Sequence, residues 1–395
     1  MIPISKAINI ILRETAVLAA ERISIEHAVG RVLAEDVVAD DALPPFDRSQ
    51  MDGYAVVAAD TKKPPVTLDI VGESAAGRGW HRTLKRGQAV RIMTGAPVPA
   101  GADSVQKIEL TTSDERTVTI LESVKKGSFI VRRGAEVRKG KKVIAKGTRV
   151  TPENIAVLAA FGYGKVKTAK QPRIAIMSTG SEIVAVNRKP GRDQIRNSNS
   201  VMLDALCRQV GAVPTIVDQV RDDLSALKSK IRAQRSDILI ITGGVSVGKY
   251  DLTKQALTEL GAEIFFEKVR LKPGKPAVFA RLGKTLVFGL PGNPVSSAVT
   301  FHLFVRTAIA RMQGSTNVLL KRGRAVLSHA TRGAKERDTY LPASLATDNT
   351  GRLVATPLKW IGSSDFIGYA RTEALIFVPA GKAYPADDVV EIAFL

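Results

Sequence analysis

The sequence predicts a multidomain protein of α/β plus β structure, in which a central α/β domain has a parallel-rich sheet. A length of 395 residues exceeds what one ordinary hydrophobic core organises, so several domains are expected. Between residues 171 and 316, apolar runs that end in glycine turns alternate with helical patterns, which is typical of a parallel sheet with connecting helices. Residues 51–139 and 317–395 instead show short β-type runs, which predict two smaller β-rich parts.

The first 170 residues combine helical ends with a β-rich middle. Apolar residues at helical spacing predict a helix over residues 5–20. The adjacent prolines Pro44 and Pro45 exclude a helix from the turn-rich stretch that runs to Val56. Thr151 and Pro152 predict the start of a helix that ends near Gly162. The small all-β module between them includes predicted strands over 66–71, 89–92, 117–121 and 129–131.

In the central part, strands and helices are predicted to alternate, and ligands in such sheets bind beyond the carboxyl ends of the strands. After about residue 314 the pattern returns to short strands, which form a small barrel or sandwich. The central strands are predicted over 174–180, 213–217, 237–244, 278–280 and 286–289, the helices over 200–210, 224–233, 252–260 and 294–312, and the C-terminal strands over 325–328, 353–356, 374–378 and 389–393.

The formal charge of +20 is the unusual bulk property, because such a surface attracts anionic substrates and polyanions. Aromatic residues make up only 5%, and no zinc finger or aromatic-rich RNA-binding signature is present, so we do not expect nucleic acid as a partner. Binding of a polyanion through the basic surface stays open, and it would weaken steeply with salt.

Cysteine, histidine and the N-terminus exclude several classes of protein. Cys207 is the single cysteine, which excludes an intrachain disulfide framework, and its helical setting predicts a buried bystander. The four histidines show no metal-ligand spacing. The N-terminus lacks a secretory signal and no apolar run is long enough to span a membrane, so the cytoplasm is the expected location.

A glycine-rich segment, residues 242–251, follows the strand over 237–244. It partly matches a P-loop, but Tyr250 stands where a small hydroxyl would have to bind magnesium, which disfavours that interpretation. The backbone amides of such a turn still form a concavity that binds anions. The segment places Gly243, Gly244, Ser246 and Gly248 at the predicted ligand edge.

Two further loops point to an anion. Lys272 and Lys275 lie on a loop with two prolines, and preorganised ammonium groups suit a phosphate, although a basic surface turn is the alternative. A glycine and proline turn opens the helix over 294–312, so amides at a helix N-terminus again favour an anion. This turn and its helix include Pro291, Gly292, Asn293 and Ser296.

Acidic residues converge on the same edge of the sheet. Glu182, Asp222 and Asp251 each follow a predicted strand or the glycine loop, so the topology brings them together. Carboxylates at an anion site would repel the anion unless a hard cation such as Mg²⁺ lies between them, which predicts a metal site. Polar residues of the same edge are Ser178, Thr179, Gly180, Ser198 and Asn199.

Five sequence motifs follow one another along the chain. They are residues 45–56 (PFDRSQMDGYAV), 91–101 (RIMTGAPVPAG), 243–248 (GGVSVG), 272–276 (KPGKP) and 289–296 (GLPGNPVS). Together they resemble the molybdopterin molybdenumtransferases, a family that includes the E domain of gephyrin. The match runs in order over about residues 5–315 and more loosely to the end. One motif is moderately specific, and five in sequence are very specific.

The resemblance implies an elongated subunit of four parts. A linking and dimerisation region covers 1–50 and 140–170, and a β-rich insert domain covers 51–139. The α/β molybdopterin-binding domain covers 171–316, and a β-barrel covers 317–395. It also implies a homodimer whose cleft joins the α/β domain of one subunit to Asp52, Thr94 and Glu136 of the other.

The implied reaction is the last step of molybdenum cofactor biosynthesis. Molybdopterin-AMP and molybdate are the substrates, molybdenum cofactor and AMP are the products, and Mg²⁺ assists. A molybdopterin adenylyltransferase would supply the substrate, and molybdoenzymes or their chaperones would accept the product. The implied catalytic residues are Asp52, Thr94, Glu136, Glu182, Asp222 and Asp251. Three of them, Glu182, Asp222 and Asp251, are the implied metal ligands. The implied substrate-binding residues are Ser178, Thr179, Gly180, Ser198, Asn199, Gly243, Gly244, Ser246, Gly248, Lys268, Lys272, Lys275, Pro291, Gly292, Asn293 and Ser296.

Three positions depart from the family pattern. Ser181 and Lys249 replace acidic residues, and Ala135 precedes Glu136 in a changed segment. A divergent paralogue with altered metal affinity, or one that takes tungstate, is therefore an open alternative. A pterin adenylyltransferase would share the α/β domain but would not need the first 170 residues. A cofactor-binding scaffold is the non-enzymatic alternative, and the acidic residues at 52, 222 and 251 argue against it.

Overall fold

The computed structural model describes residues 1–217, 219–220, 223–244, 252–359 and 362–395. The chain forms two compact units. The first contains residues 1–35, 146–155 and 165–395, and the second contains residues 36–145 and 156–164. The predicted domain boundaries at 50/51, 139/140, 170/171 and 316/317 stay predictions.

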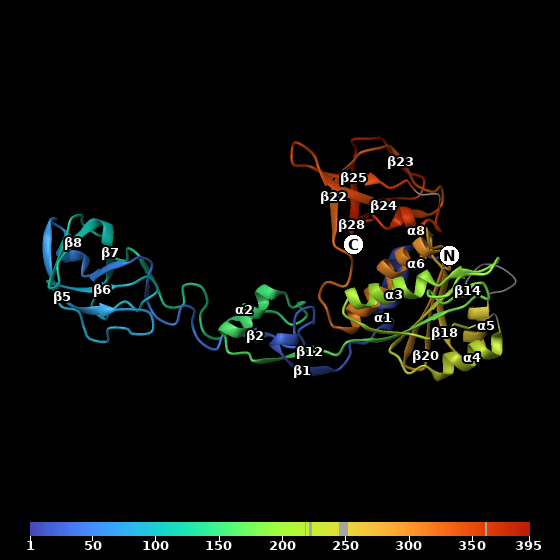
Figure 1. Cartoon of the computed structure of the whole chain (residues 1–395), viewed down its shortest axis with the longest axis horizontal. Coiled ribbons are helices and arrows are strands. Elements are labelled where there is room, and N and C mark those ends of the chain that lie inside the picture. Colours follow the sequence, from blue (N-terminus) through green and yellow to red (C-terminus); the bar gives the residue numbers. More distant parts are fainter. Residues whose placement is uncertain (218, 221–222, 245–251, 360–361) are drawn as a thin grey trace. The chain divides into compact units, whose positions relative to one another are not determined.

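The second unit is built on a six-stranded sheet with the strand order β7-β4-β6-β5-β9-β8. Tyr54, Leu68 and Val118 pack on one face of the sheet, while Val90 and Ile92 pack on the other. Its strands are drawn in blue to teal in Figure 1. They are β4 (Gly53–Val56), β5 (Val66–Ser74), β6 (Gln88–Ile92), β7 (Ser104–Lys107), β8 (Thr111–Ser113) and β9 (Thr117–Ile120).

Two predictions for this unit gain detail. The turn-rich stretch that runs to Val56 contains no helix, as predicted, and it also holds β3 (Arg48–Ser49) and the buried strand β4. The predicted strand over 129–131 is present at its last two residues, outside the six-stranded sheet. Phe129 has a φ of +57°, and β10 (Ile130–Val131) pairs with β3 instead. β2 (Val37–Val38) pairs with β11 (Lys142–Ile144) in the same way.

The N-terminal helix is shorter than predicted. α1 (Ile4–Glu14) ends at Thr15, whose backbone is extended and whose hydroxyl donates to the Ile11 carbonyl at 2.6 Å. The chain then enters β1 (Ala20–Ser24), which pairs with β12 (Lys165–Ala169). Apolar spacing beyond Glu14 therefore belongs to a connection. The predicted helix after Thr151 is present as α2 (Pro152–Ala160).

The first unit is centred on a six-stranded sheet with the order β16-β13-β17-β21-β20-β18. The first four strands are parallel, as predicted, whereas β20 and β18 are antiparallel and the strand β18 was not predicted. The bounds are β13 (Arg173–Ser178), β16 (Val213–Ile216), β17 (Ile238–Thr242), β18 (Glu263–Lys268), β20 (Pro276–Leu282) and β21 (Thr285–Leu290).

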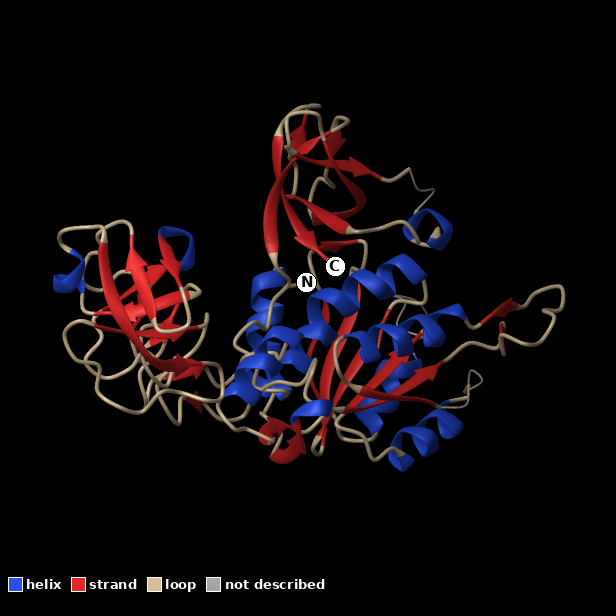
Figure 2. Ribbon diagram, turned by 60° about the vertical axis from the view of Figure 1, so that its left-hand side comes forward, coloured by secondary structure: helices blue, strands red, loops and turns tan. Residues whose placement is uncertain are grey.

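Helices cover both faces of this sheet (Figure 2). Alternate residues of β17 separate the two cores: Ile238 and Ile240 face one, and Leu239 and Ile241 face the other. The first core also holds α1, α3 (Ser198–Gln209), α6 (Pro294–Thr300), η4 (Phe301–Val305) and α7 (Arg306–Met312). The second holds α4 (Leu224–Ala233) and α5 (Leu252–Glu259). The helix predicted over 294–312 thus contains a π-helical segment, which periodicity does not reveal.

The C-terminal part of the first unit is a closed β-barrel, which decides between the barrel and the sandwich. Its five strands close through pairing of β24 with β26, and β19 (Leu271–Lys272) extends the sheet at β24. Small and branched side chains such as Ala355 and Ile376 fill the interior. The strands are β22 (Arg322–Leu327), β24 (Asp338–Thr347), β25 (Leu353–Pro357), β26 (Ala374–Val378) and β28 (Val389–Phe394). The remaining elements are η1 (Ile25–His27), η2 (Ala58–Thr61), η3 (Ile108–Leu110), β14 (Ile183–Val184), β15 (Ile195–Arg196), β23 (Thr331–Arg332), α8 (Phe366–Tyr369) and β27 (Ala383–Tyr384).

Within the described residues, every helix is too short or too polar to cross a membrane. The described residues also hold no group of three or more acidic, histidine or cysteine side chains placed to hold a metal ion. Two of the three predicted metal ligands, Asp222 and Asp251, lie outside those residues.

Candidate functional site

Three parallel strands of the central sheet end side by side at one edge. Ser178, Thr242 and Leu290 are the last residues of β13, β17 and β21, and the register aligns them across the sheet. A cavity of about 640 Å³ lies at this edge, as expected for the carboxyl ends of parallel strands. Its lining includes the predicted residues Ser178, Thr179, Glu182, Ser198, Asn199, Gly243, Gly292 and Asn293.

Two helices begin at this cavity. Asn197 is the N-cap of α3: its side-chain oxygen accepts from the Ser200 amide at 3.1 Å, and its Nδ2 donates to Ser178 Oγ at 2.9 Å. The second helix begins with Pro294 at its first turn, preceded by Asn293. Helix N-termini carry partial positive charge, so their convergence favours an anionic ligand.

Asn199 connects the ends of two strands. Its Nδ2 donates to Thr242 Oγ1 at 3.1 Å and to the Gly292 carbonyl at 2.6 Å. Thr242 Oγ1 in turn lies 3.3 Å from the Pro291 carbonyl. Asn199 Oδ1 and Thr179 Oγ1 are both buried and have no hydrogen-bond partner among the described residues. Buried polar atoms normally find a partner, so these two atoms point to a polar ligand.

The glycines after β17 allow a close approach of two backbones. Gly243 has a φ of +90°, and a Cβ there would lie 2.4 Å from the Thr179 carbonyl oxygen. At Gly244, with a φ of +63°, a Cβ would lie 2.8 Å from Thr179 Oγ1 and 2.9 Å from Thr253 Oγ1. Only glycine fits both the space and the left-handed backbone. Close packing therefore explains why the motif over residues 243–248 begins with two glycines.

Glu182 brings a carboxylate to the cavity. It follows Gly180, whose carbonyl accepts from Gln219 Nε2 at 2.6 Å, and a Cβ at Gly180 would lie 2.5 Å from the Glu182 carboxylate. The side-chain oxygens of Glu182, Ser178 and Thr179 are hard donors of the kind that Mg²⁺ prefers. The chemical type of these donors therefore matches a hard cation. The other predicted residues of this set, Asp222, Ser246, Gly248 and Asp251, lie outside the described residues.

The predicted lysines lie at the same edge but do not line this cavity. Lys268 ends β18 opposite Pro276, the first residue of β20. Because β20 runs antiparallel to β21, its start lies at the edge where β21 ends. Lys272 and Lys275 are exposed on the connection before it. Four other predicted residues also lie near this edge but do not line the cavity. They are Gly180, Gly244, Pro291 and the buried Ser296.

The second unit brings together two of its three predicted residues. Asp52 Oδ1 accepts from the Thr94 backbone amide at 2.6 Å and from the Thr94 hydroxyl at 2.8 Å. These two hydrogen bonds hold the pKa of the Asp52 carboxyl below its usual value. Glu136 instead forms an exposed ion pair with Arg48 at 3.4 Å.

The sequence reasoning missed several residues of the cavity. Arg196 lies on β15 and carries a positive charge to the lining, while Phe366 and Ser364 come from the C-terminal part of the chain. No sequence motif marks the loop before Arg196. No local signal links residues 364–366 to the ends of β13, β17 and β21, which lie far earlier in the chain. In the sequence, Thr242 is only the first residue of the glycine-rich segment, although it contributes a hydroxyl. Asn197 is recognisable there as polar but not as a helix cap.

Two titratable groups of the first unit are buried, and the burial of Cys207 was predicted. Cys207 is buried, and burial raises the pKa of its thiol to about 12, which excludes a reactive thiolate at neutral pH. Burial, reinforced by the charge of Arg306, lowers the pKa of His302 to about 4. His302 is therefore neutral at physiological pH.

Comparison with known families accounts for nearly the whole chain. Residues 2–162 match the family described as "MoeA N-terminal region (domain I and II)". Residues 175–311 match "Probable molybdopterin binding domain", which covers the cavity and its strands. Residues 324–395 match "MoeA C-terminal region (domain IV)", which covers the barrel.

Full-length relatives and solved structures agree with these matches. The chain is 34% identical to the molybdopterin molybdenumtransferase of Bacillus subtilis (strain 168), over 100% of this chain and 94% of the relative. It is 33% identical to that of Staphylococcus aureus (strain COL), over 99% and 95%. The crystal structure of a molybdopterin biosynthesis moeA protein from Pyrococcus horikoshii OT3 aligns with a TM-score of 0.86 at 28% identity, covering 100% of both chains.

Proposed function

The chain belongs to the molybdopterin molybdenumtransferase family, and from that premise we propose that it converts molybdopterin-AMP and molybdate to molybdenum cofactor and AMP. It is a transferase, and molybdenum insertion in cofactor biosynthesis is its role. The identity of the adenylylated substrate and the assistance of Mg²⁺ are the parts that we propose.

The observation that carries the proposal is the cavity at the carboxyl ends of β13, β17 and β21. Two helix N-termini and the buried, unpartnered atoms Asn199 Oδ1 and Thr179 Oγ1 meet there. A cavity of about 640 Å³ is of the size that binds small molecules in other proteins. These features suit a ligand that carries phosphate on a polar heterocycle.

In the proposed complex, the first unit binds the substrate and holds its anhydride in place. The amides at the start of α3 and α6 face the phosphate oxygens, and Arg196 adds a full positive charge. Ser178 and Asn197 are already hydrogen-bonded to each other, so this part of the cavity is preorganised. Preorganised donors stabilise charge that develops when the P–O bond of the anhydride breaks and AMP leaves. Lys268, Lys272 and Lys275 supply further positive charge at the same edge.

Glu182 is the described residue that would hold Mg²⁺, together with Asp222 and Asp251. When bound, the cation withdraws charge from a phosphoryl oxygen. Replacement of Glu182 by Gln keeps the shape of the side chain and removes its charge. We expect this variant to require a higher Mg²⁺ concentration for half-maximal activity, and an unchanged requirement would contradict the assignment.

We propose that the active form is a homodimer in which Asp52, Thr94 and Glu136 of one subunit reach the cavity of the other. The two hydrogen bonds from Thr94 to Asp52 orient the carboxylate, which supports an acceptor at that position. Mixing an Asp52→Ala subunit with a Glu182→Ala subunit is expected to restore part of the activity, because half of the mixed dimers' sites would be intact. Two inactive variants that stay inactive after mixing would contradict a shared site.

The remaining parts of the proposal concern the cellular setting. The reaction would take place in the cytoplasm, and an adenylyltransferase would supply the adenylylated pterin. Molybdoenzymes or their chaperones would accept the finished cofactor. No membrane contact or nucleic acid is part of the proposal.

The direct test is AMP release from purified molybdopterin-AMP with Mg²⁺, measured without oxyanion, with molybdate and with tungstate. The proposal predicts release that depends on molybdate and reaches one AMP per pterin. AMP release with tungstate but not with molybdate would show that tungstate is the oxyanion substrate. Tight pterin binding without release under any condition would contradict the proposal and favour a cofactor-binding scaffold.

A further inference from the structure

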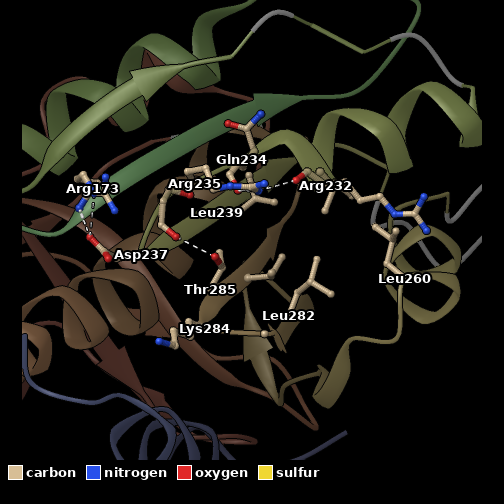
Figure 3. A pocket seen from close by; sticks show the side chains of 14 residues that line it. Arg173, Arg232, Gln234, Arg235, Asp237, Leu239, Leu260, Leu282, Lys284 and Thr285 are labelled. Carbon is tan, nitrogen blue, oxygen red and sulfur yellow. Dashed lines mark hydrogen bonds and ion pairs between the residues drawn. The ribbon is translucent and has the colours of Figure 1, made fainter.

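A second cavity lies at the opposite end of the same strands. It is bounded by the start of β13, the connection from α4 to β17, and the turn between β20 and β21 (Figure 3). Arg173 begins the strand that ends at Ser178, so the two cavities are separated by the length of the sheet. The volume of about 560 Å³ again falls in the range of ligand sites. The proposed reaction does not use this cavity.

Positive charge dominates its lining. Its lining contains four cationic side chains and one carboxylate, which leaves a formal surplus of three positive charges: the cations are Arg173, Arg232, Arg235 and Lys284, and the carboxylate is Asp237. Asp237 accepts from the Arg173 backbone amide at 2.8 Å and lies 3.7 Å from its Nε. Arg232 and Lys284 are exposed and form no ion pair with any described residue. An anionic partner would therefore meet cations that the chain itself does not neutralise.

Arg235 is held in place while part of its guanidinium stays available. Its Nη1 donates to the Arg232 carbonyl at 2.9 Å and to the Gln234 carbonyl at 3.2 Å. Both hydrogen bonds use the same nitrogen, so Nε and Nη2 have no partner among the described residues. A guanidinium fixed in this way suits bidentate binding of a carboxylate.

The helix ends near this cavity differ from those at the other edge. α4 ends at Ala233 and α5 ends at Glu259, so both present their C-termini and the partial negative charge of free carbonyl groups. That charge weakens the attraction of any anion placed directly at the helix ends, whereas the free carbonyl groups accept hydrogen bonds from N–H donors. A peptide provides both carboxylates and backbone N–H groups. None of the described residues that line the cavity is aromatic, so a nucleotide base would have no ring on which to stack.

The floor of the cavity is apolar. Leu239 and Val287 are buried strand residues, and Leu260 and Leu282 are partly exposed at its wall (Figure 3). Burying one leucine-sized side chain against them would strengthen binding, because apolar surface leaves water. An apolar floor with several cations in the same lining fits a segment with an apolar side chain between acidic ones.

We propose that this cavity is a docking site for an acidic peptide segment of a partner protein, with a large apolar side chain seated on Leu239, Leu260 and Leu282. Carboxylates on either side of that side chain bind Arg232, Arg235 and Lys284. Because the cavity lies away from the catalytic edge, a partner can dock while substrate is bound. At such a site, part of the formal net charge of +20 would serve to bind a specific partner.

The test measures fluorescence anisotropy of a labelled heptapeptide with a central leucine flanked on each side by two acidic residues. The chain is compared with the double variant Arg232→Glu/Lys284→Glu and with the control Lys125→Glu/Lys126→Glu. The control changes the net charge equally at exposed lysines of the second unit. We expect the first variant to weaken binding tenfold or more and the control to change it less than twofold. Circular dichroism and thermal unfolding verify that both variants fold.

Two further arms decide what the cavity recognises. A peptide with serine in place of leucine is expected to bind about fivefold or more weakly, because the apolar floor loses its partner. Equal binding of the two peptides would overturn the proposal, as would equal loss in both protein variants or no binding to the native chain. Displacement of the peptide by inorganic triphosphate at a lower concentration than by unlabelled peptide would identify a phosphate site instead. None of these readouts depends on AMP release.

Discussion

The two ends of the central sheet both attract anions, but by different physical means. At the carboxyl end, helix N-termini, glycine turns and buried hydroxyl and amide groups line the cavity, with Arg196 as the cation in its described lining. At the amino end, four cationic side chains stand over an apolar floor beside two helix C-termini. The first end relies on fixed backbone dipoles, and the second relies on side-chain charge.

This difference separates chemistry from recognition. Fixed dipoles in a partly buried cavity stabilise charge without reorganisation, which a reaction requires. The charges of exposed lysine and arginine side chains are screened by salt, which suits reversible docking. The parallel topology produces both ends, because every strand of the parallel set starts at one edge and finishes at the other.

The largest effect is expected from Asn199→Ala at the carboxyl end. This variant removes the hydrogen bonds to Thr242 Oγ1 and the Gly292 carbonyl, together with the buried Oδ1. We expect kcat/KM for AMP release to fall about a hundredfold or more, which corresponds to about 3 kcal/mol. The exposed Asn349→Ala in the barrel is the control. Equal activity of the two variants would remove Asn199 from the site.

A glycine pair tests the close packing at the same end. Gly243→Ala places a Cβ 2.4 Å from the Thr179 carbonyl oxygen, whereas Gly261→Ala, also at positive φ, meets nothing within 4 Å. We expect Gly243→Ala to lower the free energy of unfolding by about 3 kcal/mol and Gly261→Ala by about 1 kcal/mol. Urea denaturation measures both. Similar losses would show that backbone strain alone explains the effect.

The helix that begins at the carboxyl end buries His302 in a neutral state. The folded pKa of about 4 lies below the ordinary 6.5, so the unfolded chain binds a proton that the folded chain does not. Stability from neutral burial is therefore lost as pH falls from about 6.5 to about 4. We expect native protein to lose about 3 kcal/mol over this range that His302→Leu does not lose. The exposed His329→Leu should behave like native protein in urea denaturation at each pH.

The smallest effect concerns the carboxylate that we assign to the shared site. Thr94→Val removes the hydroxyl that donates to Asp52 but keeps the backbone amide bond. The pKa of Asp52 should therefore rise toward its usual value without reaching it. NMR titration of the carboxyl carbon measures the change, and Thr94→Ser should restore the lower pKa. No rise in Thr94→Val would mean that the amide bond alone sets it.

Sequence reasoning located the carboxyl end because its signals are local. A buried apolar strand followed by Ser178-Thr179-Gly180 or by Gly243-Gly244 specifies both a strand and the turn that ends it. Parallel topology then brings these turns together, and the structure places eight of the predicted residues around one cavity. The closed barrel required pairing of β24 with β26, a long-range feature that alternation alone does not specify.

Other features depended on contacts that no local pattern shows. Phe366 reaches the cavity from a helix of four residues far along the chain. The docking cavity is formed by four separate segments, and its cations appear in the sequence as isolated residues such as Arg232 and Lys284. The N-terminal helix ended early because the chain after Thr15 enters a strand pair with β12, which overrides helical spacing.

The central claim is that chemistry takes place at the carboxyl end of the sheet and not at the amino end. The most direct measurement is single-turnover, molybdate-dependent AMP release by native protein, Asn199→Ala and Arg232→Glu/Lys284→Glu under identical conditions. We expect a large loss of rate in Asn199→Ala and a native rate in the charge-reversal variant. A native rate in Asn199→Ala combined with a large loss in the charge-reversal variant would contradict it.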